Sequence, residues 1–177
     1  EGFTYIRSTG QKLNLASGRV YFEQAMQGKN YVVDPAFSSV INAVLMFYAV
    51  PVYNYNGRIH GVAVSVIKGN RLSHIVSGIT IGDRYHPFVV SKSTGEIIGQ
   101  PEDYEIDLEN NVALKEAIDT AVGGFEDIME YTDTVTGQKM SFLARSVPTK
   151  PEWLVVCSLP YDYYFGGLKR IQRVIFI

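Results

Sequence analysis

The chain has 177 residues, 46% of them hydrophobic, so it can bury a core in one compact domain or in two small ones. Its 16 basic and 18 acidic side chains nearly balance, which removes any charge bias toward nucleic acid or acidic lipid. The single cysteine, Cys157, excludes an intrachain disulfide and a cysteine-based zinc site. Twelve tyrosines, nine phenylalanines and 16 glycines favour a sheet-rich fold with many turns.

The first half of the sequence predicts five strands and one helix. The strands, in chain order, are expected at 3–7, 11–15, 31–34, 44–53 and 58–67. Asn56-Gly57, between the last two, is the strongest hairpin signal in the chain because both residue types readily adopt positive φ. The helix opens at Ser17 or Gly18 and ends at Gly28, where glycine suits a helix C-terminus.

The second half predicts a similar set of elements. Residues 72–79 carry apolar side chains at i, i+3, i+4 and i+7, which indicates a helix that links two modules. Beyond it, strands are expected at 88–91, 96–98, 128–133, 139–147 and 153–159, and a helix at 111–122. The segment 92–98 repeats 7–13, so the chain reads as a duplication. Two modules, each with a sheet of about five antiparallel strands and flanking helices, define an α+β fold.

The helix that begins near residue 19 carries the leading candidate site, which favours binding over catalysis. Arg19 is suited to a ligand carboxylate because its planar guanidinium donates two parallel hydrogen bonds. Tyr21 and Phe22 would wall the pocket, one with a hydroxyl and the other with a bare ring face. The alternative is structural: Arg19 pairs with Glu23 or Asp34 and pins the helix.

Strand residues complete the predicted site. Tyr31 and Asp34 lie on the strand after the helix, and Asp34 either receives a cation or donor or serves the turn at the following proline. Met46 and Tyr48 alternate with their neighbours along the next strand, so one alternate set faces the helix side. They either line the pocket or pack the core.

The sequence predicts no catalytic residue, no metal site and no cofactor. The three histidines are His60, His74 and His86, and none belongs to a motif with metal or nucleophile spacing. Cys157 ends the apolar run that begins at Trp153, which is typical of a core-filling residue in a buried strand.

The order of five motifs resembles a double Cache (tandem PAS-like) domain. In chain order they are Arg-x-Tyr-Phe-x-x-Ala-x-x-Gly at 19–28, Asp-Pro at 34–35, Pro-Val-Tyr-x-x-Asn-Gly-x-Ile-x-Gly-Val at 51–62, Leu-Ser-x-Ile-Val at 72–76 and Thr-Gly-Glu-Ile-Ile-Gly at 94–99. The resemblance covers nearly the whole chain and implies two tandem PAS-like modules. It further implies an extracytoplasmic sensor domain of a prokaryotic transmembrane receptor, such as a chemoreceptor, histidine kinase or diguanylate cyclase.

The resemblance also assigns roles to the two modules. Residues 1–79 would form the membrane-distal, ligand-binding module, and residues 80–177 the membrane-proximal one. The basic stretch 168–173 and apolar 174–177 fall where the second membrane span would begin, although an amphipathic helix packed on the domain is the alternative. The chain lacks the family's long N-terminal helix and reads as a piece of a receptor that is homodimeric in full.

The sequence departs from the family's amino-acid-binding pattern at one telling position. The family's aspartate, which faces a ligand ammonium, would fall within 63–66, where Ser65 is the polar residue and no acid is present. Ser65 is retained as a candidate ligand contact. The ligand expected is a small carboxylate, an amino-acid-like compound or another small metabolite. A structural or partner-binding domain, with the tyrosine-rich cluster 161–165 as its contact surface, is the alternative.

Overall fold

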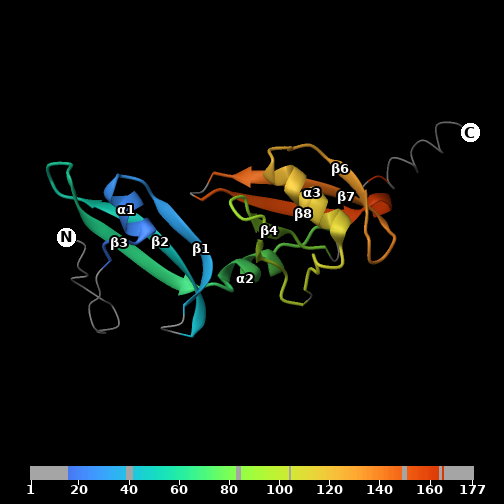
Figure 1. Cartoon of the computed structure of the whole chain (residues 1–177), viewed down its shortest axis with the longest axis horizontal. Helices are drawn as coiled ribbons and strands as arrows, with labels where there is room; N and C mark the ends of the chain where they lie inside the picture. The colour runs from blue at the N-terminus through green and yellow to red at the C-terminus, as the bar shows by residue number, and fades with distance from the viewer. Residues whose placement is uncertain are drawn as a thin grey trace, which may run out of the picture. The chain divides into compact units, whose positions relative to one another are not determined.

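The computed structural model describes residues 16–38, 42–82, 85–103, 105–148, 151–163 and 165. Its elements are α1 (Val20–Met26), β1 (Tyr31–Ser38), β2 (Ala43–Tyr53), β3 (Ile59–Lys68), α2 (Arg71–Ser77), β4 (Phe88–Ser91), β5 (Ile97–Gly99), α3 (Val112–Val122), β6 (Met129–Thr132), β7 (Lys139–Val147) and β8 (Trp153–Pro160), as Figure 1 shows. Antiparallel sheets with a few helices confirm the predicted α+β fold. The described residues form two compact units: the first runs to Gly69 and includes Pro151, and the second holds the rest.

The first unit is built on an antiparallel sheet in the order β1-β2-β3. The predicted Asn-Gly hairpin joins β2 to β3, with Gly57 at φ +74°. The Asn54 side chain holds this turn, since its Oδ1 accepts hydrogen bonds from the backbone N–H groups of Asn56 and Arg58 at 2.9 and 3.0 Å. The strands predicted at 3–7 and 11–15 lie outside the described residues.

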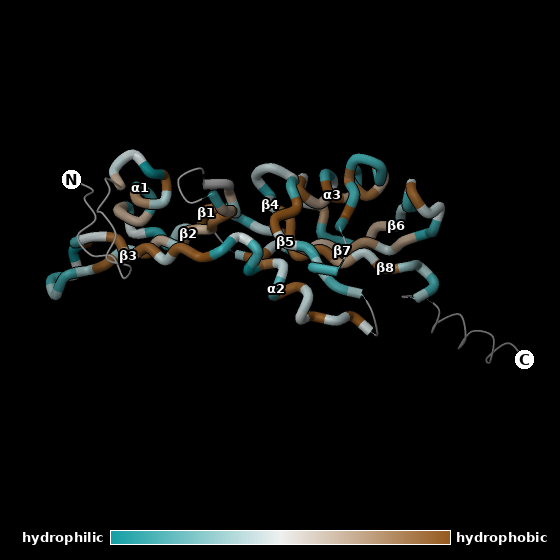
Figure 2. Tube along the Cα trace, turned by 90° about the horizontal axis from the view of Figure 1, so that it is seen from below, coloured by the Kyte–Doolittle hydropathy of each residue, from teal (hydrophilic) through white to brown (hydrophobic). Residues whose placement is uncertain are grey.

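Helix α1 lies over one face of this sheet (Figures 1 and 2). The ring of Tyr21 stacks on that of Phe47 in β2, with centroids 5.4 Å apart and planes 3° from parallel. Ala25, one turn further on, is fully buried. Gly28 follows the helix at φ +85°, which is the conformation that its predicted role at the helix end requires.

Strand β1 is longer than the sequence predicts, because it continues beyond Asp34 through Pro35 to Ser38. Its register with β2 shifts between Val33 and Ala36. A proline has no N–H to give to a ladder, and a bulge is one of the few strand positions that tolerate it. The irregularity therefore lets the strand pass the proline and resume pairing.

The second unit is a five-stranded antiparallel sheet in the order β5-β4-β8-β7-β6, with α3 on one face (Figures 1 and 2). The apolar side of α3 packs with the sheet to form the core, whose buried members are Phe88, Val90, Leu114, Ala117, Ile118, Ala121, Phe142, Ala144, Leu154 and Val156. Both units contain a helix followed by three strands that pair in chain order, as a duplicated chain would. The segment 7–13, on which the predicted repeat partly depends, lies outside the described residues.

Helix α2 belongs to the second unit and does not stand as a linker before it. Its buried residues Leu72 and Val76 pack it on β4 and β5. At Gly99 in β5, an added Cβ would lie 2.6 Å from the Cβ of Leu72, so glycine is what allows this close approach. The division between the units accordingly falls after Gly69, whereas the sequence analysis drew the module boundary after residue 79.

The predicted start of a membrane span within 168–177 lies outside the described residues. Of the helices in the described part of the chain, none has the length and apolar character to cross a membrane.

Candidate ligand-binding site

Arg19 stands immediately before α1, where its backbone carbonyl accepts hydrogen bonds from the N–H groups of Phe22 and Glu23 at 2.9 and 3.1 Å. Its side chain is exposed. Within the described residues the guanidinium makes neither a hydrogen bond nor an ion pair, so the alternative pairing with Glu23 or Asp34 is not seen there. Five donors of a rigid, permanently charged group thus stay available to a ligand.

The two aromatic residues of α1 are both half-buried. One face of the Tyr21 ring stacks on Phe47, and this stack fixes the helix to β2. Phe22 lies three positions before the buried Ala25, on the adjoining part of the same helix surface. The Tyr21–Phe47 stack therefore fixes the helix that Arg19 precedes to one face of the sheet.

Strand pairing shows which sheet residues share the face that α1 covers. Phe47 contacts α1, and side chains two apart on a strand point the same way, so Ala49 shares the face of Phe47. Tyr31 and Val64 pair directly with Ala49 from the two neighbouring strands. Of the predicted strand residues, Tyr31 therefore lies on the same face as α1.

Three predicted site residues lie on the other face of the sheet. Met46 and Tyr48 alternate with Phe47, and Ser65 pairs directly with Tyr48. Met46 is fully buried, which is what the alternative of core packing predicts. These three side chains are thus separated by the sheet from Tyr21 and from α1.

The sequence analysis missed the residues that occupy the helix side of the sheet in their place. Val64 and Val66 lie on this face at 40% and 48% exposure, in the same cross-strand rows as Ala49 and Phe47. The alternation along β2 allows either set of residues to face α1, and the Tyr21–Phe47 contact shows which set does. Asp34 is half-buried at the register shift of β1.

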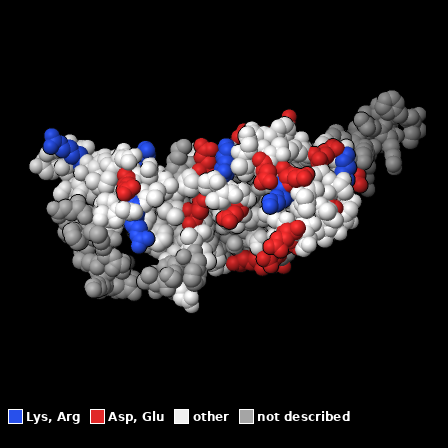
Figure 3. All heavy atoms as spheres, viewed as in Figure 1, with Lys and Arg blue, Asp and Glu red and all other residues white. Residues whose placement is uncertain are grey.

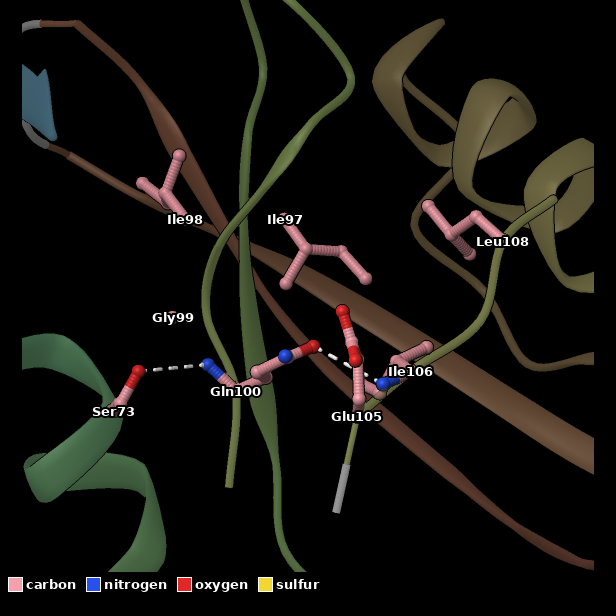
Figure 4. Close-up of a pocket in the computed structure, with 8 residues that line it drawn as sticks. All are labelled: Ser73, Ile97, Ile98, Gly99, Gln100, Glu105, Ile106 and Leu108. Atoms are coloured by element: carbon pink, nitrogen blue, oxygen red, sulfur yellow. Dashed lines mark hydrogen bonds between the residues drawn. The ribbon is translucent and has the colours of Figure 1, made fainter. Parts of the chain in front are cut away.

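Two adjoining open hollows lie in the second unit, and none of the eight predicted site residues lines them. The first, of about 370 Å³, is lined by Ser73, Ile97, Ile98, Gly99, Gln100, Glu105, Ile106 and Leu108 (Figure 4). The second, of about 550 Å³, is lined by Asn70, Ser73, Gln100, Pro101, Glu102, Asp103 and Glu105. They share three lining residues, so they form one groove between α2, the end of β5 and the loop that follows it.

Cys157, His74 and His86 all lie in the second unit. Burial raises the pKa of the half-buried Cys157 thiol, which keeps it protonated. His74 on α2 lies 3.1 Å from Glu102, and Nδ1 of His86 lies 2.8 Å from the carbonyl oxygen of Ile79. Among the described residues, no three His, Cys, Asp or Glu side chains are grouped as a metal would require.

The family model of the Cache domain, dCache_1, matches residues 2–168. The chain therefore belongs to the Cache domain family, which confirms the resemblance that its motifs carry.

Solved structures with the same fold include three sensor domains. The chain is similar to the extracellular domain assigned to the histidine kinase mmHK1S-Z3 (18% identity, TM-score 0.62, 92% of this chain and 62% of that one). It is similar to the sensory domain of the Campylobacter jejuni chemoreceptor Tlp3 with isoleucine bound (14% identity, TM-score 0.61, 89% of this chain and 61% of that one). It is also similar to the ligand-binding domain of the Pseudomonas aeruginosa chemoreceptor PctC in complex with GABA (18% identity, TM-score 0.57, 88% of this chain and 66% of that one).

The chain spans less than two thirds of the length of each of these three structures. At these identities the likeness establishes the fold. No curated protein matches the chain at a significant level.

Proposed function

We propose that the chain is the extracytoplasmic ligand-binding part of a prokaryotic transmembrane receptor, and that its first unit captures a small metabolite through Arg19. The observation that carries the proposal is an exposed arginine, without a partner among the described residues, on a helix that aromatic stacking fixes to the sheet of a Cache domain. The ligands bound in two solved structures of the same fold, isoleucine and GABA, both bear a carboxylate that such a group suits.

The ligand favoured by this site is a small carboxylate or a flat, uncharged metabolite. Arg19 would bind a carboxylate through two parallel hydrogen bonds. Residues 63–66 of β3 supply no acid to balance an ammonium group, and Ser65 faces away from α1. An α-amino acid would therefore leave its ammonium without a charged partner from this strand.

The proposal assigns ligand capture to the first unit, as the membrane-distal module, and transmission to the second, as the membrane-proximal one. Aromatic contacts support packing of the described residues that follow β8: Tyr85 meets Tyr163 edge-on at 5.0 Å, and Tyr161 lies 4.7 Å from Phe165. Ligand binding would bias this packing, and it can do so only by the difference in affinity for the two states. A receptor of this kind would work as a homodimer in the membrane.

The same contacts weigh against the alternative of a partner-binding domain without a small-molecule ligand. That alternative uses the cluster 161–165 as an exposed contact surface. The Lys139 ammonium instead lies over the Tyr161 ring, 3.9 Å from its centroid. The Tyr163 ring contacts Tyr85, and the Phe165 ring contacts Tyr161. These contacts support packing of the described residues of the cluster within the second unit.

A thermal-shift screen of the chain tests the proposal with amino acids, small carboxylates, amines and purines. A ligand that binds only the folded state at about a hundred times its Kd adds about 2.7 kcal/mol to the free energy of unfolding. We expect a hit among the carboxylates or flat metabolites, and we expect Arg19→Ala to weaken its binding by roughly tenfold or more.

Arg58→Ala is the matched control, because Arg58 is exposed in the same unit and serves its turn only through its backbone. This variant should keep the full shift. A shift that survives in Arg19→Ala, or the absence of any hit, would contradict the assignment of the site to Arg19.

A further inference from the structure

Val64 and Val66 form an apolar strip on the side of the first sheet that α1 covers. Each ends a cross-strand row of uncharged side chains, and the two rows are Tyr31, Ala49 and Val64, and Val33, Phe47 and Val66. The two valines are 40% and 48% exposed, so α1 leaves much of their surface in contact with water. Because they lie two residues apart on one strand, they present a continuous aliphatic surface on one face.

The second unit shows how completely a helix can cover the corresponding strands. There, α3 is likewise followed by three strands that pair in chain order, and Leu154 and Val156 of the last strand are 1% and 0% exposed in the core with α3. Helix α3 has eleven residues, whereas α1 has seven. The shorter helix covers less of its sheet, which leaves the strip of Val64 and Val66 open.

The strip lies beside the first turn of α1, which Arg19 precedes. Tyr21 of that turn stacks on Phe47, and Phe47 pairs directly with Val66. Arg19 stands two residues before Tyr21, which is about 3 Å along a helix axis. The free guanidinium and the apolar strip therefore belong to the same end of the helix.

Neither β2 nor β3 supplies an acid to this strip. Among the described residues of the first unit the acids are Glu23 of α1 and Asp34 of β1. Figure 3 shows this unit with mostly uncharged surface, whereas acidic side chains gather on the second unit. A second charged group on the ligand, whether ammonium or carboxylate, would meet valine side chains and lose hydration without gaining a partner.

We propose that Val64 and Val66 set the ligand class of the Arg19 site, and that this class is the short-chain aliphatic monocarboxylates. The inference rests on the proposed function, because it takes Arg19 as the group that binds the carboxylate. The hydrocarbon chain of the ligand lies on the strip, which removes apolar surface of both partners from water. Dicarboxylates and amino acids bind less well, because their second charge falls on the same strip.

Calorimetric titration of the chain with propanoate, butanoate and pentanoate tests the ligand class. We expect the affinity to rise by roughly fourfold with each added methylene, because each one is buried against the strip. Succinate has the same number of carbons as butanoate but carries a second carboxylate. It should bind at least about tenfold more weakly than butanoate.

Val66→Asp tests the strip itself. It should weaken butanoate binding by roughly tenfold or more and strengthen the binding of 4-aminobutyrate, whose ammonium gains a carboxylate partner. Val50→Asp is the matched control, because Val50 is 42% exposed and alternates with Ala49, so it lies on the opposite face of the sheet. It should leave both affinities unchanged. Val66→Thr, which nearly keeps the shape of valine, should weaken butanoate several-fold and provides the test if the aspartate variant does not fold.

The outcomes separate this inference from the proposed function. If succinate binds as tightly as butanoate and both are lost in Arg19→Ala, the aliphatic class is overturned while the proposed function stands. Equal weakening of butanoate in Val66→Asp and Val50→Asp would assign the effect to general charge repulsion and overturn the role of the strip. Carboxylate binding that survives in Arg19→Ala, or no carboxylate binding at all, would overturn the proposed function and this inference with it.

Discussion

Gly99 shows how a single missing side chain positions α2. A Cβ at this position would lie 2.6 Å from the Cβ of Leu72 and 3.3 Å from its carbonyl carbon. Neither atom can turn away, because both belong to or adjoin the helix backbone. Gly99→Ala should therefore push α2 off β5 and lower the free energy of unfolding by about 1–3 kcal/mol, measured by urea denaturation.

Gly61→Ala is the control for that substitution, because a Cβ at position 61 would meet no atom within 4 Å and the backbone there does not have a positive φ. The change in its free energy of unfolding should stay within about 0.5 kcal/mol. Similar losses in the two variants would show that general effects of a glycine substitution, and not the contact with Leu72, set the cost.

At the scale of elements, a polar network joins the start of α3 to the turn between β6 and β7. Asn111 caps the helix by accepting the Leu114 N–H at 3.2 Å, and its Nδ2 donates to Asp133 at 2.6 Å. Asp133 also accepts the N–H groups of Val135 and Thr136. Burial opposes ionisation of Asp133, but the hydrogen bonds from Thr136, Asn111 and Val135 outweigh it and lower its pKa.

Because the folded state lowers the pKa of Asp133, its carboxylate stabilises the fold above its usual pKa. This contribution is lost as pH falls through the lowered value. Asp133→Asn should reduce the free energy of unfolding near neutral pH by about 1 kcal/mol, and the difference should shrink at about pH 2.

Urea denaturation of both proteins at the two pH values measures this effect. Glu116→Gln, an exposed acid of α3, is the charge-matched control. A deficit in Asp133→Asn that is as large in acid as at neutral pH would assign its cause to packing and not to the charge.

Features set by local chemistry could be predicted from the sequence, whereas strand register and the face of the sheet that meets a helix could not. Gly28 and Asn56-Gly57 act through their own backbone preferences, so the helix end and the hairpin follow from the sequence. The passage of β1 through Pro35 depends on a register shift against β2. The face of β2 toward α1 depends likewise on the contact of Phe47 with Tyr21, which no local pattern encodes.

At the scale of the whole molecule, the order of weak motifs identified the Cache family, but it did not reveal the groove of the second unit. The groove combines Ser73 of α2, Gly99 of β5 and Glu105 of the following loop. These residues meet only because α2 packs on β5, while the sequence analysis treated 72–79 as a linker. Arg19, Tyr21 and Phe22 could be named as candidates because the family's motif places them in one continuous segment, and their role as ligand contacts stays a prediction.

The measurement that tests the account most directly is a calorimetric titration of the chain with succinate and 4-aminobutyrate, in parallel with Arg19→Ala and Arg58→Ala. We predict saturable binding of at least one carboxylate, weakened by roughly tenfold or more in Arg19→Ala and unchanged in Arg58→Ala. Equal affinity in Arg19→Ala, or no binding of either compound to the unchanged chain, would contradict the claim that the first unit senses a carboxylate through Arg19.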